Sequence, residues 1–119
     1  MTMPVSAQVR ERCRALLEPG EEIRYLIPAD NPMAGSFLIA VTDLRIAVLM
    51  TSLRHRDRPD HLHASFPRST LFGPVDTTWG PYIRLGGWDY EVDEEYVAEL
   101  AAADAETSGT TPYDPLPDL

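Results

Sequence analysis

Lysine is absent from this chain of 119 residues, and cysteine occurs once, as Cys13. All ten basic residues are arginine, a bias typical of a GC-rich genome, because arginine codons contain more G and C than lysine codons. A single cysteine excludes an internal disulfide. The most apolar stretch, 37–50, contains Asp43 and Arg45 and is shorter than the roughly 20 residues of a membrane helix. No signal-peptide core follows Met1, so we expect a cytoplasmic protein.

Basic charge is also missing from the last third of the chain. Residues up to Arg84 include all ten arginines and nine carboxylates, whereas the residues from Leu85 onward include ten carboxylates and no base. Proteins that bind polyanions gain affinity from basic side chains, so this charge argues against nucleic acid or a membrane surface as the partner. The length fits one compact domain, which we expect over residues 1–106, and argues against a two-domain enzyme.

An amphipathic helix is predicted over residues 5–17. Ser6 can cap its start, and Pro19 with Gly20 suits a type II turn just beyond its end. Cys13 falls on its apolar stripe, where a thiol acts as a small filler rather than as a reactive group. The apolar residues that recur at steps of three and four are Val5, Val9, Cys13, Leu16 and Leu17.

β-Structure is predicted to follow this helix. A short strand at 23–27 precedes a loop at 28–36, which is rich in residues that interrupt strands. Two longer apolar strands, 37–42 and 45–51, then join across a tight turn at Asp43 and the residue after it. The first half of the chain therefore predicts an antiparallel hairpin as its central feature.

Both faces of that hairpin are apolar. A tight turn sets Val41 opposite Ile46 and Leu38 opposite Leu49. An antiparallel sheet with one wet face would alternate, so the second face needs a cover: the first helix, another sheet or a partner chain. The candidate interaction surface that this reasoning selects comprises Leu38, Ala40, Ala47 and Leu49.

A second hairpin is predicted near the C-terminus, after two weak strands around 61–66 and 70–76. Its strands, 82–85 and 88–92, flank Gly86 and Gly87, which suit a two-residue turn that requires positive φ angles. Such a turn pairs Leu85 with Trp88, Ile83 with Tyr90 and Arg84 with Asp89, and it places both aromatic rings on the packed face.

The chain is then predicted to end in a helix and a tail. Asp93 fits as the N-cap of a helix that reaches about Ala105, with Tyr96 and Leu100 on its apolar face. Residues 107–119 are rich in proline and acid and lack an apolar period, so we expect a disordered tail. This tail either improves solubility or docks on another protein in extended form.

Few residues form a pattern that supports chemistry. His61 and His63, two apart on a predicted strand, supply only half of a zinc site, so we expect no metal and no cofactor. The serines lie in no nucleophile elbow, and no catalytic residues are assigned. An alternative to a solvated loop is an anion site at 54–58, where Asp57 partly neutralises the basic residues; its candidates are Arg54, His55, Arg56 and Arg58.

Two turn motifs give the chain a family resemblance. The segment Leu-Glu-Pro-Gly-Glu-Glu at 17–22 leads into a strand, and Val-Thr-Asp-Leu-Arg at 41–45 forms a tight hairpin. With the short strands and the final capped helix, this order resembles the short bacterial pleckstrin-homology-like (PH-like or GRAM-like) domains over residues 16–105. The resemblance implies an α+β fold that is mostly β with two helices: a bent antiparallel sandwich or partly open barrel, capped by the C-terminal helix.

The resemblance does not transfer a lipid-binding role. The best-known members of that family bind phosphoinositide head groups through basic residues around the first hairpin loop. In this chain that loop corresponds to residues 28–36, which contain Asp30 and no base. We therefore expect a non-enzymatic protein-interaction or assembly module whose partner is another protein or a second copy of the chain. The alternative is a small-ligand, anion or lipid-headgroup domain that uses residues 54–58, and a small enzyme is a distant third.

Overall fold

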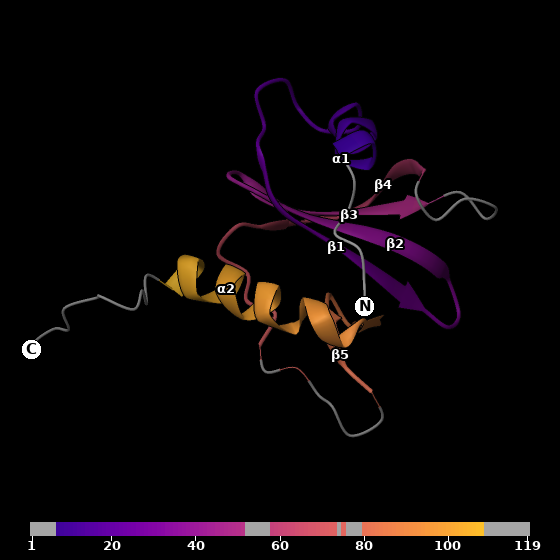
Figure 1. Ribbon diagram of the computed structural model, residues 1–119, viewed down its shortest axis with the longest axis vertical. Coiled ribbons are helices and arrows are strands. Elements are labelled where there is room, and N and C mark those ends of the chain that lie inside the picture. Colours follow the sequence, from indigo (N-terminus) through magenta and orange to yellow (C-terminus); the bar gives the residue numbers. More distant parts are fainter. Residues whose placement is uncertain (1–6, 52–57, 74, 76–79, 109–119) are drawn as a thin grey trace, which may run out of the picture.

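The computed structural model describes residues 7–51, 58–73, 75 and 80–108. Within them the chain is mostly β with two helices, and six strands form one curled antiparallel sheet in the order β4-β3-β2-β1-β6-β5 (Figure 1). This confirms the predicted fold class. The elements are α1 (Ala7–Arg14), β1 (Ile23–Asn31), β2 (Gly35–Thr42), β3 (Arg45–Thr51), β4 (Pro59–Pro67), β5 (Tyr82–Leu85), β6 (Trp88–Val92), the 3-10 turn η1 (Glu94–Tyr96) and α2 (Val97–Ser108).

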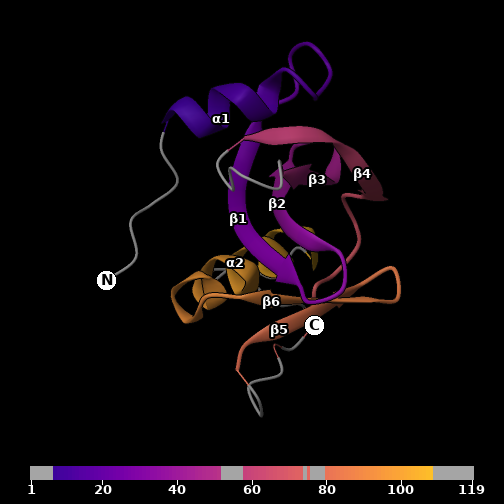
Figure 2. The ribbon, with the colours of Figure 1, turned by 90° about the vertical axis from the view of Figure 1, so that its right-hand side faces the viewer.

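The main core lies on the concave face of the sheet, where α2 packs. Strands β1, β2 and β3 contribute alternate apolar side chains, and the β5–β6 hairpin closes the space from the other side (Figure 2). Tyr96, Leu100 and Ala103 of η1 and α2 complete this core, each at most 5% exposed. The helix predicted to cap the sheet therefore fills its hollow.

A second core lies on the convex face, beneath α1 (Figures 1 and 2). Val9 and Cys13 of α1 pack there against the outer side chains of β1, β2 and β3. Of the three covers that the doubly apolar hairpin allowed, the first helix is the one present. The predicted interaction residues are at most 3% exposed and hence buried within the chain: Leu38, Ala40, Ala47 and Leu49.

A β-bulge at Arg24 lets β1 serve both cores. Ile23 pairs with Thr42 and Tyr25 pairs with Val41, so one extra residue lies on β1 between two consecutive partners on β2. Strict alternation would put Ile23 and Tyr25 on the same face. The bulge instead turns Ile23 toward α1, while Tyr25 packs against the concave core.

Both predicted hairpins have the expected register. Val41 pairs with Ile46 and Leu38 with Leu49 across the β2–β3 turn. The β5–β6 pairs are likewise those predicted from the two-glycine turn, with Gly86 at φ 58° and Gly87 at φ 84°. The register was predictable because a two-residue turn fixes every cross-strand pair that follows.

Several predicted boundaries are wrong in the described residues. The segment 28–36 is mostly strand rather than loop, because β1 continues to Asn31 and the turn that follows is short. Residues 70–73 form no strand; the backbone N–H groups of Phe72 and Gly73 instead donate to the Asp104 carboxylate of α2, at 2.8 and 2.9 Å. A side chain outside the sheet thus satisfies donors that a strand would have paired.

The helices also differ from their predicted limits. The first is described from Ala7 and ends at Arg14, three residues early, because the chain tightens into a turn; Ser6 lies outside the described residues. Asp93 occupies the predicted cap position without a side-chain capping bond, and α2 continues to Ser108. No helix in the described part of the chain is long and apolar enough to cross a membrane.

Candidate functional site

Most of the candidate anion site lies outside the residues that the structure describes. Arg54, His55 and Arg56 lie outside the described residues, and Arg58 is exposed just before β4. The anion hypothesis therefore stays a prediction.

The two histidines of β4 lie in different surroundings. His61 is exposed, with its Nδ1 atom 3.3 Å from an Asp60 carboxylate oxygen. The His63 ring lies between Phe37 and Trp88, with centroid distances of 5.1 and 4.9 Å. Within the described ranges, no group of three histidine, cysteine, aspartate or glutamate side chains could hold a metal ion.

The residues that carry the family resemblance form a buried clamp. Glu21, whose side chain is 0% exposed, accepts two hydrogen bonds from the Arg45 guanidinium at 2.9 and 3.1 Å. The Thr42 hydroxyl donates to the same carboxylate at 2.6 Å, and the Glu18 backbone N–H donates at 3.0 Å. Burial alone raises the pKa of Glu21, but these donors outweigh it and hold the pKa below its ordinary value.

Two further hydrogen bonds join the same two turns, one to the Asp43 carboxylate and one between backbone groups. Asp43 accepts from the Glu22 N–H at 3.0 Å and returns its own N–H to the Glu22 carbonyl at 3.1 Å. The 17–22 segment and the β2–β3 turn are thus fastened together at one end of the sheet. These contacts assign the two motifs a role in folding, since they leave the Glu21 carboxylate saturated with internal donors.

Tyr25 and two arginines form a second cluster around Glu106 of α2. The Glu106 carboxylate accepts from the Arg24 Nε atom at 3.0 Å, the Tyr25 hydroxyl at 2.5 Å and the Arg68 guanidinium at 3.4 Å. Arg68 also donates to the Thr107 hydroxyl. Cations near a helix C-terminus are favourable, so this cluster anchors the last turn of α2 to the sheet.

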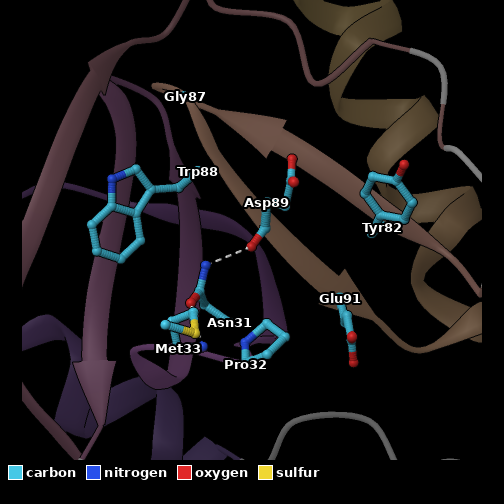
Figure 3. A pocket seen from close by; sticks show the side chains of 8 residues that line it. All are labelled: Asn31, Pro32, Met33, Tyr82, Gly87, Trp88, Asp89 and Glu91. Carbon is cyan, nitrogen blue, oxygen red and sulfur yellow. Dashed lines mark hydrogen bonds between the residues drawn. The ribbon is translucent and has the colours of Figure 1, made fainter.

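An open groove of about 570 Å³ lies between the β1–β2 turn and the β5–β6 hairpin (Figure 3). The turn residues Asn31, Pro32 and Met33 lie together beside β6 in this view, with Trp88 on one flank and Tyr82 and Glu91 on the other. Its lining residues are Asn31, Pro32, Met33, Tyr82, Gly87, Trp88, Asp89 and Glu91. Most of that lining is apolar surface, bordered by two carboxylates.

Asn31 fixes the shape of this groove. Its side-chain oxygen accepts from the N–H groups of Met33 and Ala34, at 2.8 and 2.9 Å, which rigidifies the turn. Its side-chain nitrogen donates to the Asp89 carbonyl at 2.9 Å and so ties the turn to β6. The Ala34 N–H also donates to the Asn31 carbonyl, which makes residues 31–34 a β-turn. Pro32 occupies the second position of this turn, where its fixed φ angle is favourable.

Two large apolar side chains that line the groove are exposed to solvent. Met33 is 95% exposed, and Trp88 is 40% exposed although it lies on the same face of β6 as the buried Tyr90. The prediction that Trp88 belongs to the packed face is therefore only partly right. Its ring extends past the end of the concave core to His63.

Sequence reasoning did not find this groove. The breaker-rich segment 28–36 predicted a loop and concealed the tight turn that presents Met33. The signal that could have found it is Asn31 before Pro32, because an asparagine that bonds two N–H groups ahead favours a tight turn.

Comparisons of this chain with protein-family models, with curated proteins and with solved structures find no match.

Proposed function

We propose that this chain is a non-enzymatic protein-interaction module that binds its partner in the groove between the β1–β2 turn and the β5–β6 hairpin. The observation that carries the proposal is that Met33 and Trp88, two large apolar side chains, both line this groove and are both exposed to solvent. Exposed apolar surface with a polar border is typical of protein contact sites, and tryptophan and methionine are enriched at such interfaces.

The rigidity of the turn supports this proposal. The Asn31 side chain accepts two hydrogen bonds and donates one, and with the ring of Pro32 these bonds fix the shape of the groove before any partner binds. A preformed site loses less conformational entropy on binding. The family stays a proposal as well: the curled sheet with its C-terminal helix agrees in outline with the PH-like shape that the turn motifs imply.

Selection from a random peptide library displayed on phage tests the proposal. The full chain serves as bait. Each enriched peptide is then added to a Trp79→Phe variant, in which Trp88 is the one remaining tryptophan, and the tryptophan fluorescence is recorded. We expect enriched peptides to bind with micromolar affinity and to change the Trp88 emission.

Met33→Ser should weaken that binding at least about tenfold, because it removes an exposed apolar side chain and puts a polar group on the apolar wall. Leu44→Ser is the matched control, since Leu44 is 58% exposed at the β2–β3 turn, at the other end of β2. Failure to enrich any peptide, or equal loss of binding in both variants, would overturn the proposal.

A further inference from the structure

We infer that the groove selects a linear segment in which an apolar side chain is followed at short distance by arginine or lysine. This inference rests on the proposed function and adds the chemistry of the partner. Three features carry it: a smaller pocket that shares Glu91 with the groove, the negative charge around that pocket, and the aromatic rings that line the groove.

A smaller pocket of about 150 Å³ adjoins the groove, and Glu91 lines both. Pro28, Asp30, Val92 and Asp93 complete the smaller pocket. Asp30 pairs with Glu91 across the β1–β6 ladder, so both side chains lie on one face of the sheet, and the Asp30 carboxylate also accepts from the Ser36 hydroxyl at 2.8 Å. Glu91 thus lies between an apolar compartment and a smaller one bordered by Asp30, Asp93 and Glu91 itself.

The one base of the β5–β6 hairpin is already engaged. Arg84 bonds the Asp89 carboxylate through its Nε atom at 3.0 Å, on the opposite strand of the β5–β6 hairpin. No base follows Arg84 in the sequence, while η1 adds further carboxylates beyond Asp93. Since Asp89 is paired with Arg84, the border from Glu91 to Asp93 is the part of the groove with a negative potential that a cation would neutralise.

This charge disfavours a second copy of the chain as the occupant. Two copies related by a two-fold axis would place the same patch of each against the other. Their carboxylates at Asp30, Glu91 and Asp93 would then face one another, and like charges at an interface are costly. A partner with positive charge meets no such penalty.

The groove walls also suit a cationic side chain. Trp88 and Tyr82 line the apolar compartment, and the face of an aromatic ring attracts a guanidinium or ammonium group. The aliphatic stem of arginine or lysine can lie along Pro32 and Met33 while its charged end reaches Glu91. An apolar neighbour in the same segment would fill the space beside Trp88.

A double-mutant cycle between protein and peptide tests this inference. The peptides enriched on the full chain are sequenced, and one is synthesised with each arginine in turn replaced by citrulline, its neutral counterpart of nearly equal shape. We expect enriched peptides to carry arginine or lysine near an apolar residue. Both citrulline at the critical position and Glu91→Gln should weaken binding about fivefold, and the two changes together should weaken it no further.

Glu18→Gln is the matched control, because it removes the same charge before the other end of β1. It should leave the arginine peptide's affinity within a factor of two. Binding should also weaken as salt rises for the arginine peptide more than for the citrulline peptide.

Enriched peptides without basic residues, or equal affinity for arginine and citrulline peptides, would overturn the inference and leave the proposed function standing. Failure to enrich any peptide would overturn both. A dimer in sedimentation that Met33→Ser dissociates would overturn the inference in favour of a second copy.

Discussion

Glu21 shows how a single buried carboxylate organises one end of this protein. Its oxygens accept from Arg45, Thr42 and the Glu18 backbone, so its charge is neutralised by a partner that is itself 19% exposed. The residue sits in a turn whose φ requirements Pro19 and Gly20 meet, with Gly20 at φ 84°. Local turn chemistry and a long-range ion pair therefore converge on the same four-residue segment.

Removal of the Glu21 charge should destabilise the fold. We expect Glu21→Gln to lower the free energy of unfolding by about 2 kcal/mol, because Arg45 would lose its counter-charge in a largely buried setting. Urea unfolding followed by circular dichroism measures this. Glu11→Gln is the control, since it breaks only the exposed pair with Arg14 and should cost at most about 0.5 kcal/mol. Equal losses in the two variants would refute the clamp.

Single residues of the groove were the hardest to predict. The register of the second hairpin correctly places Trp88 and Tyr90 on one face, yet alternation does not say how far the core extends along it. Tyr90 lies over Phe37, with ring centroids 5.3 Å apart, whereas Trp88 lies beyond that core. Exposure at the end of a strand depends on what the rest of the fold places there, which periodicity cannot show.

The two-glycine turn allows a sharp test at the level of one element. A Cβ atom at Gly86 would come within 2.8 Å of the Phe66 ring, while a Cβ at Gly87 would meet nothing within 4 Å. Both residues have positive φ, so alanine costs about 1 kcal/mol at either position. We expect Gly86→Ala to cost about 1 kcal/mol more than Gly87→Ala in chemical unfolding, because Phe66 must move. Equal costs would show that β4 does not press on this hairpin.

Docking of α1 can be followed through its one thiol. Cys13 is fully buried, and burial raises its pKa to about 11, so we expect it to resist thiol reagents at neutral pH until α1 detaches. Val9→Ala weakens that docking, and we expect about tenfold faster labelling. Equal labelling rates in native and urea-unfolded protein would contradict the buried position of α1.

Elements with strong local signals were predictable, and those defined by distant contacts were not. The glycine turn and the turn at Asp43 fixed two hairpins with their registers, and apolar spacing placed both helices. The segment around Phe72 has strand-like composition, but Asp104 of α2 takes its N–H groups. The limits of α1 likewise depend on packing. The sequence alone left three alternatives for what covers Leu38.

At the scale of the whole molecule, acid should act through two carboxylates that link distant segments. Glu21 and Glu106 both have pKa values below the ordinary 4.5, the first through the donors described above and the second chiefly through the Tyr25 hydroxyl. Their stabilising effect is complete above the unfolded-state pKa and is lost as the pH falls through the lower native values. Burial raises the pKa of Glu99, which acts in the opposite sense.

We therefore expect the free energy of unfolding to fall below about pH 4.5 more steeply in the wild type than in Glu21→Gln combined with Glu106→Gln. Urea unfolding at a series of pH values measures the two slopes. Glu99→Gln removes a carboxylate without these contacts, and its slope is compared with that of the double variant. Parallel slopes in wild type and double variant would show that other groups control the acid response.

The bulge at Arg24 has a consequence for changes in chain length. Because Arg24 is the extra residue between two paired positions, its deletion would convert an irregular strand into a regular one and leave Ile23 directed toward α1. Removal of one residue anywhere from Tyr25 to Asn31 would instead invert the order of inward and outward side chains on one side of the cut. Deletion of Arg24 is thus the one-residue deletion in β1 that would leave the side chains of both cores on their present faces of the sheet.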